Sequence, residues 1–334
     1  MQMLNLQFMN FKFFEYMSDK LVQYILTTVV YYDVMDYPMT SFEVWKYLIR
    51  INNAQVTAKG WSAEEQEDFS LANVISLLET HEKIKKYIDS KQGYYFLRGR
   101  AELLEKHLER NKISEKKIKI VLAVAKVLRF VPYVRMVAIA GRLAPKNAEK
   151  SSDLDLLVAV KHGKIFTGRL LVTILVHVLG KRRYGRKITD RICLNHFITT
   201  KFSIAARDLF SSHEYVFLKP VFDNDFFLLF QKNNSWIQDY RPNFAQAVDN
   251  ISLLKDSSIS RTVRKIGEKL LKSSWIERRL GDWQKNKIAK NPQSQKIGGL
   301  ILCSDEELAF WPNFEKQGPA VFEKFQAKLR IIME

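Results

Sequence analysis

Hydrophobic positions near the start of the chain recur at helical spacing. They predict a helix over residues 19–35, which Pro38 ends because its ring and missing N–H do not suit a helix interior. Thr40 or Ser41 caps a second predicted helix, which runs through Ile49. Two consecutive helices therefore open the part of the chain in which the pattern is clear.

The next segments predict a third helix and a β-hairpin. Residues 52–68 are polar and acidic and indicate a loop, and residues 70–79 again show helical spacing. An alternating stretch over 83–88 and an aromatic run over 94–97 predict the two strands of the hairpin. Three helices followed by a hairpin are the order of a winged-helix module, to which we assign residues 1–105.

The charges of this winged-helix-like module disfavour base reading in DNA. The predicted third helix has no Lys or Arg between Ser70 and Thr80, and Glu79 and Glu82 lie at its end. A protein that docks on DNA needs basic residues around the docking element to neutralise phosphates. We therefore expect a packing or dimerisation role, although the basic residues of the hairpin keep a contact through the wing open.

The pattern changes to β-branched runs in the middle of the chain, residues 106–202. Long helices over 101–130 precede a small mixed sheet. The predicted elements of the sheet are a strand from Val134 to Ala140, a strand from Asp153 to Val160, a helix over about 165–179 and a strand from Ile192 to Ile198. The predicted fold class is α+β, with this small domain between the N-terminal module and a C-terminal region.

Residues 203–334 are predicted to be mostly helical. The helical segments are an aromatic-rich stretch over 222–240, a basic amphipathic helix over 261–287 and a last helix over about 320–332, with one short strand near 297–302. We expect Trp275 and Trp283, both on the basic helix, to belong to the core rather than to a surface that stacks on bases.

The charge changes the picture because it is large and uneven. The chain has a net charge of +17. Residues 101–200 hold 21 Lys and Arg against 8 Asp and Glu, a net of +13. A field of this sign attracts anions such as a nucleotide or a nucleic acid. The basic residues are most concentrated in segment 181–187. This segment is either a solvated loop or a surface beside a phosphate site.

Two further features bear on location. Cys193 and Cys303 are the only cysteines, too few for a disulfide framework, which points to a reducing compartment. The most apolar run, 170–179, is half the length of about 20 residues that a bilayer core requires. The N-terminus lacks the pattern of a signal peptide. We expect a cytoplasmic protein with no membrane partner.

The candidate chemistry lies where the first two predicted strands meet. Asp153 and Asp155 are two positions apart, which places both side chains on one face of a strand. Adjacent carboxylates repel each other unless a cation lies between them, and carboxylate oxygens with phosphates suit Mg²⁺. Gly141 ends the preceding strand in a turn, where backbone N–H groups can approach a phosphate.

The pattern of strand, glycine, loop, Asp-x-Asp and strand resembles the DNA polymerase beta-type nucleotidyltransferase superfamily, over about residues 118–200. The spacing from Leu143 to Asn147 and the N-terminal module are also similar to uncharacterised bacterial nucleotidyltransferase-domain proteins. The resemblance implies that Asp153 and Asp155 hold Mg²⁺, which bridges the triphosphate of an NTP. The residues implied to bind the nucleotide are Gly141, Arg142, Asn147 and Ser152.

The resemblance also implies a reaction in which a hydroxyl of an acceptor attacks the α-phosphorus and pyrophosphate leaves. The acceptor is a nucleic acid, a protein hydroxyl or a small molecule. Two departures put activity in question. Arg142 replaces the serine that usually follows the glycine, and the strand 192–198 lacks the usual third carboxylate.

The candidates for that third position are Asn195, His196, Asp190 and the more distant acids Asp208 and Glu214. Asparagine cannot act as a base, and a lone strand histidine is more often structural than catalytic. The sequence therefore predicts a nucleotidyltransferase, with a non-catalytic protein that binds nucleotide or nucleic acid as the alternative.

Overall fold

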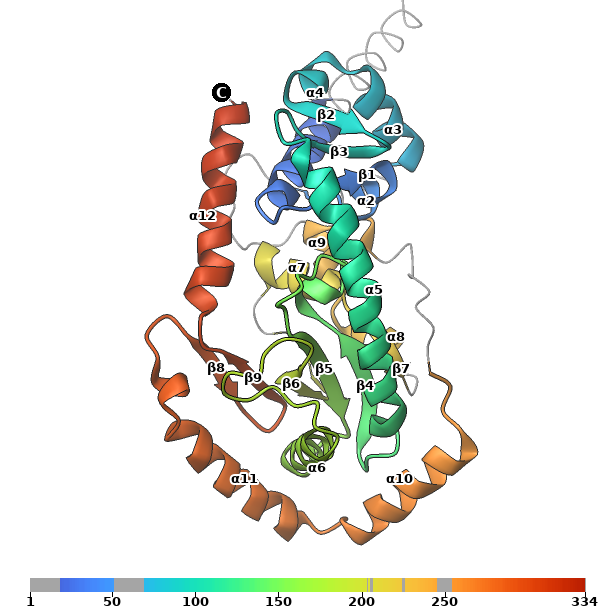
Figure 1. Cartoon of the computed structure of the whole chain (residues 1–334), viewed down its shortest axis with the longest axis vertical. Coiled ribbons are helices and arrows are strands. Elements are labelled where there is room, and N and C mark those ends of the chain that lie inside the picture. Colours follow the sequence, from blue (N-terminus) through green and yellow to red (C-terminus); the bar gives the residue numbers. More distant parts are fainter. Residues whose placement is uncertain are drawn as a thin grey trace, which may run out of the picture.

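A computed structural model provides the structure of the chain. It describes residues 19–50, 69–202, 204, 207–223, 226–244 and 254–333. An N-terminal module lies at one end, and a long helix leads from it to a six-stranded sheet (Figure 1). α10 (Ser258–Leu270) and α11 (Ser274–Ala289) run around the far end of that sheet, and α12 (Phe314–Met333) runs back toward the N-terminal module. The α+β class with a mixed sheet is confirmed.

The N-terminal module contains the predicted helices. After a helix over residues 19–33, its elements are β1 (Met39–Thr40), α2 (Ser41–Lys46), α3 (Leu71–Thr80), α4 (Glu82–Tyr87), β2 (Ile88–Lys91) and β3 (Tyr94–Leu97). Thr40 caps α2 by accepting the backbone N–H of Glu43, whose side chain bonds back to Thr40. The strands pair antiparallel in the order β1-β3-β2.

One prediction in this module is wrong. The alternating stretch over 83–88 is not the first strand of the hairpin but mostly helix α4, and β2 begins only at Ile88. Ile84 and Ile88 are both buried and lie four positions apart, a spacing that also suits one face of a helix. The predicted loop over 52–68 lies outside the described residues.

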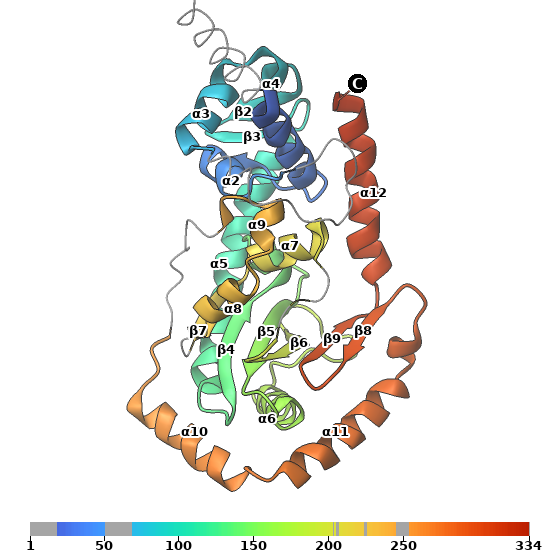
Figure 2. The ribbon, with the colours of Figure 1, turned by 180° about the vertical axis from the view of Figure 1, so that it is seen from behind.

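A single long helix connects the module to the sheet. α5 (Glu102–Leu128) is one continuous helix of 27 residues, where the sequence predicted long helices over 101–130. It lies along one side of the sheet in both views (Figures 1 and 2). Leu103 and Leu104 are buried in its first turns, and Val121, Val124 and Leu128 are buried near its end beside β4.

The six strands have the order β7-β4-β5-β6-β9-β8. They are β4 (Val134–Ile139), β5 (Leu154–Val160), β6 (Ile192–Thr199), β7 (Lys219–Asp223), β8 (Leu300–Cys303) and β9 (Glu307–Trp311). Only β5 and β6 are parallel, and α6 (Ile165–Val178) makes the crossover between them. The first three strands follow the prediction closely, and three further strands come from the chain after residue 202.

The C-terminal region is mostly helical, as predicted, and also supplies β7, β8 and β9. Its helices are α7 (Leu209–Val216), α8 (Phe227–Asn233), α9 (Ile237–Tyr240), α10 (Ser258–Leu270), α11 (Ser274–Ala289) and α12 (Phe314–Met333). Within the part of the chain that the structure describes, no helix combines the length and the apolar character needed to cross a membrane.

The predicted helix over 261–287 is two helices, and its tryptophans are not in the core. The Lys164 ammonium donates to the carbonyl oxygens of residues 271, 272 and 273, at 3.0 to 3.1 Å, which ends α10 there. Ser273 then caps α11 by accepting the N–H of Trp275. Trp275 and Trp283 are 58% and 49% exposed, so the expectation that they are core residues is wrong.

Candidate functional site

Gly141 lies directly beside the carboxylate of Asp155. The end of β4 runs antiparallel to the start of β5, and the N–H of Ala140 donates to the carbonyl oxygen of Asp155 at 3.0 Å. Gly141 follows with φ of +57°, a conformation that L side chains rarely adopt. A Cβ at this position would lie 2.7 Å from Oδ2 of Asp155. Both the positive φ and the closeness of Asp155 therefore disfavour any residue with a Cβ at position 141.

Two carboxylates and a thiol converge next to this turn. Asp153 precedes β5 and Asp155 lies on it, and the parallel pairing with β6 places Cys193 opposite Asp155. One ligand atom from each of the three residues lies within 4.8 Å of the others. The sequence places the two aspartates together, as predicted, but not the cysteine. Cys193 joins them only through the register of β5 with β6.

Burial makes it unfavourable for Asp153 and Asp155 to be charged at the same time. Desolvation, together with the charge of Asp153, raises the pKa of Asp155 to about 7. Desolvation and the two neighbouring carboxylates raise the pKa of the Cys193 thiol. Asp155 is nevertheless partly accessible to solvent. The site therefore favours a cation, which would relieve the repulsion between the acids.

An arginine side chain partly offsets the negative charge of the two acids. Nη1 of Arg183, from the basic segment 181–187, lies 2.6 Å from Oδ2 of Asp153 and 3.4 Å from Sγ of Cys193. Nδ2 of Asn195 donates to Oδ1 of Asp155 at 3.3 Å. At least one residue of the predicted basic segment thus contacts the acidic site, while its side chain stays 44% exposed.

The three candidate acids for the third position lie in different surroundings. Asp190 pairs with the buried Lys117 at 2.6 Å, and Asp208 caps α7 by accepting the N–H of Ser211 at 2.7 Å. Glu214, on α7, has no hydrogen bond or ion pair among the described residues. Its charge contributes to the raised pKa of Asp155, so Glu214 is the acid that is electrostatically coupled to the site.

His196 points away from the acidic pair. Its Nε2 lies 3.0 Å from Oε1 of Glu307 on β9, and its ring contacts the rings of Tyr215 and Trp311. It is buried among these side chains, so the contacts favour the structural interpretation. Cys193 and Asn195 are the residues of β6 that contact the acidic site.

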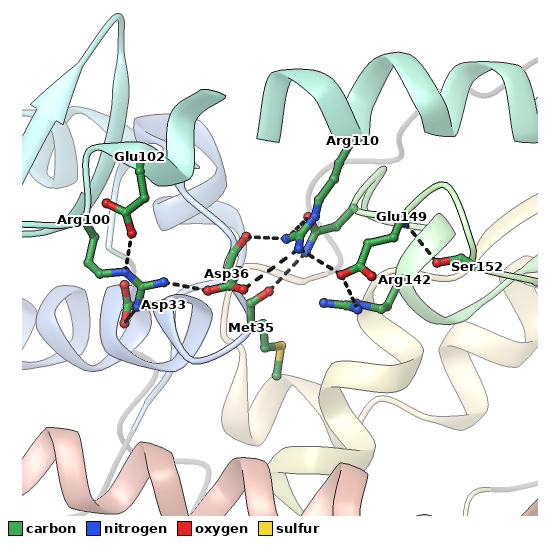
Figure 3. Close-up of polar contacts among 10 residues, drawn as sticks. Asp33, Met35, Asp36, Arg100, Glu102, Arg110, Arg142, Glu149 and Ser152 are labelled. Atoms are coloured by element: carbon green, nitrogen blue, oxygen red, sulfur yellow. Dashed lines mark hydrogen bonds and ion pairs between the residues drawn. The ribbon is translucent and has the colours of Figure 1, made fainter. Parts of the chain in front are cut away.

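The remaining predicted phosphate ligands form a second cluster (Figure 3). Arg142 and Arg110 both bind Oε1 of Glu149, at 3.0 and 2.9 Å. Asn147 is buried, accepts from Arg110 at 3.3 Å and donates to the carbonyl oxygen of Met35 at 3.2 Å. The Ser152 hydroxyl accepts the N–H of Glu149 at 3.0 Å. These contacts hold the loop 142–152 and attach it to the N-terminal module; a phosphate-binding role for the three residues stays a prediction.

Glu214 provides a test of the electrostatics that does not depend on activity. Burial raises its pKa from 4.5 to about 7, so between these values the folded chain binds a proton that the unfolded chain has lost. The contribution of Glu214 to stability therefore falls as the pH rises through this window. We expect Glu214→Gln to be more stable than the wild type by about 2 kcal/mol at about pH 8.

The measurement is urea unfolding of both proteins across the pH range. The difference in free energy of unfolding should vanish as the pH falls below about 3.5, where Glu214 is protonated in both states. Glu105→Gln, an exposed glutamate on α5, is the matched control and should stay within about 0.5 kcal/mol throughout. A difference for Glu214→Gln that does not change with pH would contradict the assignment.

We compared the chain with known proteins. No protein family, curated protein or solved structure matches it.

Proposed function

We propose that this chain is a metal-dependent nucleotidyltransferase that transfers a nucleoside monophosphate from an NTP to a hydroxyl acceptor. The observation that supports it best is the pair Asp153 and Asp155 directly beside the strand-ending Gly141, at one end of a mixed sheet. A glycine turn suits phosphate oxygens, and paired carboxylates suit a hard cation that is completed by phosphate.

The donor atoms fit Mg²⁺. Asp153 and Asp155 would hold the ion, which supplies neutralisation of the triphosphate charge. Cys193 adds a sulfur atom, a soft ligand that suits metals other than Mg²⁺. Asp153 and Asp155 supply carboxylate oxygens, the ligands that Mg²⁺ prefers.

In this proposal the acceptor oxygen forms a bond to the α-phosphorus while the bond from that phosphorus to the bridging oxygen of the β-phosphate breaks. Pyrophosphate leaves, and the proton of the acceptor hydroxyl passes to a base. We assign Glu214 as that base, because its charge acts on Asp155, which places it near the site, and because a pKa of about 7 suits proton transfer at neutral pH. Arg183 can turn from Asp153 to a phosphate oxygen, which arginine binds in bidentate fashion.

A specific observation favours the second candidate, a non-catalytic protein that binds nucleotide or nucleic acid. The side of β6 that contacts the acidic site carries Cys193 and Asn195, and neither residue is a carboxylate. If Glu214 does not serve in place of that carboxylate, nucleotide binding without transfer remains the function. The positive charge around the site supports binding of a polyphosphate in either case.

The test is incubation of the purified protein with Mg²⁺ and each α-labelled NTP in turn, with bulk RNA as an added acceptor. We expect label on the protein itself or on the RNA, and we expect Asp153→Asn to lose roughly a thousandfold in rate. Asp305→Asn, an exposed aspartate on the β8–β9 turn, is the matched control. Transfer that survives Asp153→Asn would exclude the proposal, whereas Mg²⁺-dependent NTP binding without transfer would support the second candidate.

A further inference from the structure

α10 is an amphipathic helix that turns its apolar face to solvent. Ile259, Val263, Ile266 and Leu270 are spaced by four, three and four residues, which places them on one face. They are between 44% and 75% exposed. An apolar stripe of this kind normally faces the core of the protein.

Polar contacts hold α10 in this orientation. Glu268 forms hydrogen bonds of 2.8 and 3.1 Å with the guanidinium of Arg135, and it accepts the N–H of Tyr133 at 3.1 Å. Arg264 is buried and pairs with Asp256. The helix thus binds the protein through its polar side, and the apolar stripe has no cover among the described residues.

α11 continues this surface with aromatic side chains. Trp275, Arg279 and Trp283 are spaced by four residues and lie on the face opposite Gly281, Gln284 and Ile288, which are buried. Arg279 lies over the ring of Trp275, 5.4 Å from its centroid. α10 and α11 together form the outer edge of the molecule beyond α6 in both views (Figures 1 and 2). We call residues 258–289 the α10–α11 edge.

The free charges of α10 and the turn that follows it are positive. Four basic side chains there are exposed and have no ion pair among the described residues: Arg261, Lys265, Lys269 and Lys272. The acids Glu268 and Glu277 instead bind inward, Glu268 to Arg135 and Glu277 to the N–H groups that begin α6. Asp282 on α11 is the one exposed acid of the edge, against these four exposed basic side chains. A partner of this edge must therefore be apolar and anionic at once.

We propose that the α10–α11 edge binds the surface of a membrane that contains anionic lipid. A helix with an aliphatic face, a lysine-rich polar face and neighbouring tryptophans is typical of helices that lie in the plane of a bilayer interface. Anionic headgroups add attraction for each Lys or Arg near the surface. The expectation of no membrane partner rests on the lack of a spanning segment, and a helix in the interface plane needs none.

Two other occupants fit the edge less well. Nucleic acid would satisfy the basic side chains, but it would leave Ile259, Val263, Ile266 and Leu270 facing phosphates and water. A second copy of the chain would cover the apolar stripe, but a symmetric contact would bring like-charged lysines toward each other. A bilayer interface satisfies both the apolar and the basic side chains.

The test is flotation of the full chain with vesicles of phosphatidylcholine, with and without phosphatidylglycerol. We expect binding only to the anionic vesicles and a loss of binding as salt is raised. Leu270→Glu should weaken partitioning by about tenfold. Ile331→Glu is the matched control, because Ile331 on α12 is 73% exposed, close to the 75% of Leu270, and should bind as the wild type does.

Lys269→Gln tests the electrostatic part and should weaken binding to anionic vesicles by roughly fivefold. Unchanged melting temperatures for these exposed positions would show that each variant is folded. Equal binding by Leu270→Glu and Ile331→Glu, or no vesicle binding by the wild type, would overturn the proposal. So would a wild-type dimer in light scattering that Leu270→Glu dissociates, because the stripe would then be an interface between copies.

Discussion

Asp155→Asn is expected to lower the rate of nucleotidyl transfer by roughly a thousandfold while making the protein more stable. The loss of rate follows because an amide cannot replace a carboxylate as a charged ligand for Mg²⁺. The gain in stability follows because the Asp155 carboxylate lies within 4.8 Å of that of Asp153, in surroundings that disfavour charge. Asparagine keeps the size of the side chain and can still accept from Asn195.

The measurement pairs the label-transfer assay with urea unfolding of the same preparation at neutral pH. We expect the free energy of unfolding to rise by about 1 kcal/mol, since a carboxylate that costs stability is typical of a site kept for function. Asp305→Asn should change neither quantity, because Asp305 is exposed and its ion pair with Lys285 lies at the surface. An inactive Asp155→Asn that is also less stable would point to a structural role and contradict this expectation.

Gly141→Ala is expected to cost about 3 kcal/mol of stability and to impair transfer in the protein that still folds. About 1 kcal/mol of this comes from the positive φ, which alanine adopts unfavourably. The remainder comes from the new methyl group, which would lie 2.7 Å from Oδ2 of Asp155. Either the carboxylate or the end of β4 must move, and both belong to the proposed site.

Gly163→Ala separates these two contributions. Gly163 has φ of +71°, close to the backbone conformation of Gly141, but nothing lies within 4 Å of a Cβ at that position. It should therefore lose only about 1 kcal/mol, with no effect on transfer. Chemical denaturation of the two variants beside the wild type gives the comparison. Equal losses of stability would show that the contact with Asp155 does not constrain residue 141.

The structure shows which groups the basic residues of segment 101–200 contact. The net charge of +13 over residues 101–200 predicted an anionic partner without identifying which basic residues matter. Arg183 binds the acidic pair, whereas Arg110 and Lys117 hold the loop 142–152 through Glu149 and backbone carbonyl oxygens. Part of the charge is thus structural, and composition alone does not distinguish it from charge that attracts a ligand.

Local patterns predicted the elements that carry the proposed site. β4, β5, α6 and β6 begin and end within two residues of their predicted bounds, because runs of β-branched residues and glycines report on the local backbone. The prediction fails where two patterns coincide. Ile84 on α4 and Ile88 on β2 fit an alternating strand as well as one face of a helix. The end of β7 overlaps the start of the stretch 222–240, whose aromatic residues suggested a helix.

The sequence by itself determined the α+β class and the helices of the N-terminal module, since these depend on neighbours a few positions away. It also predicted Asp153 and Asp155 beside Gly141, since β4 and β5 follow each other in the chain and pair directly. Only the tertiary structure brought Cys193, Asn195 and Arg183 to the acidic pair, because the register of β5 with β6 sets their distance. It also decided that the apolar face of α10 points outward, since Glu268 and Arg264 bind the body of the protein through partners far from them in sequence. Periodicity along one helix shows that an apolar face exists, and contacts between distant segments decide which way it points.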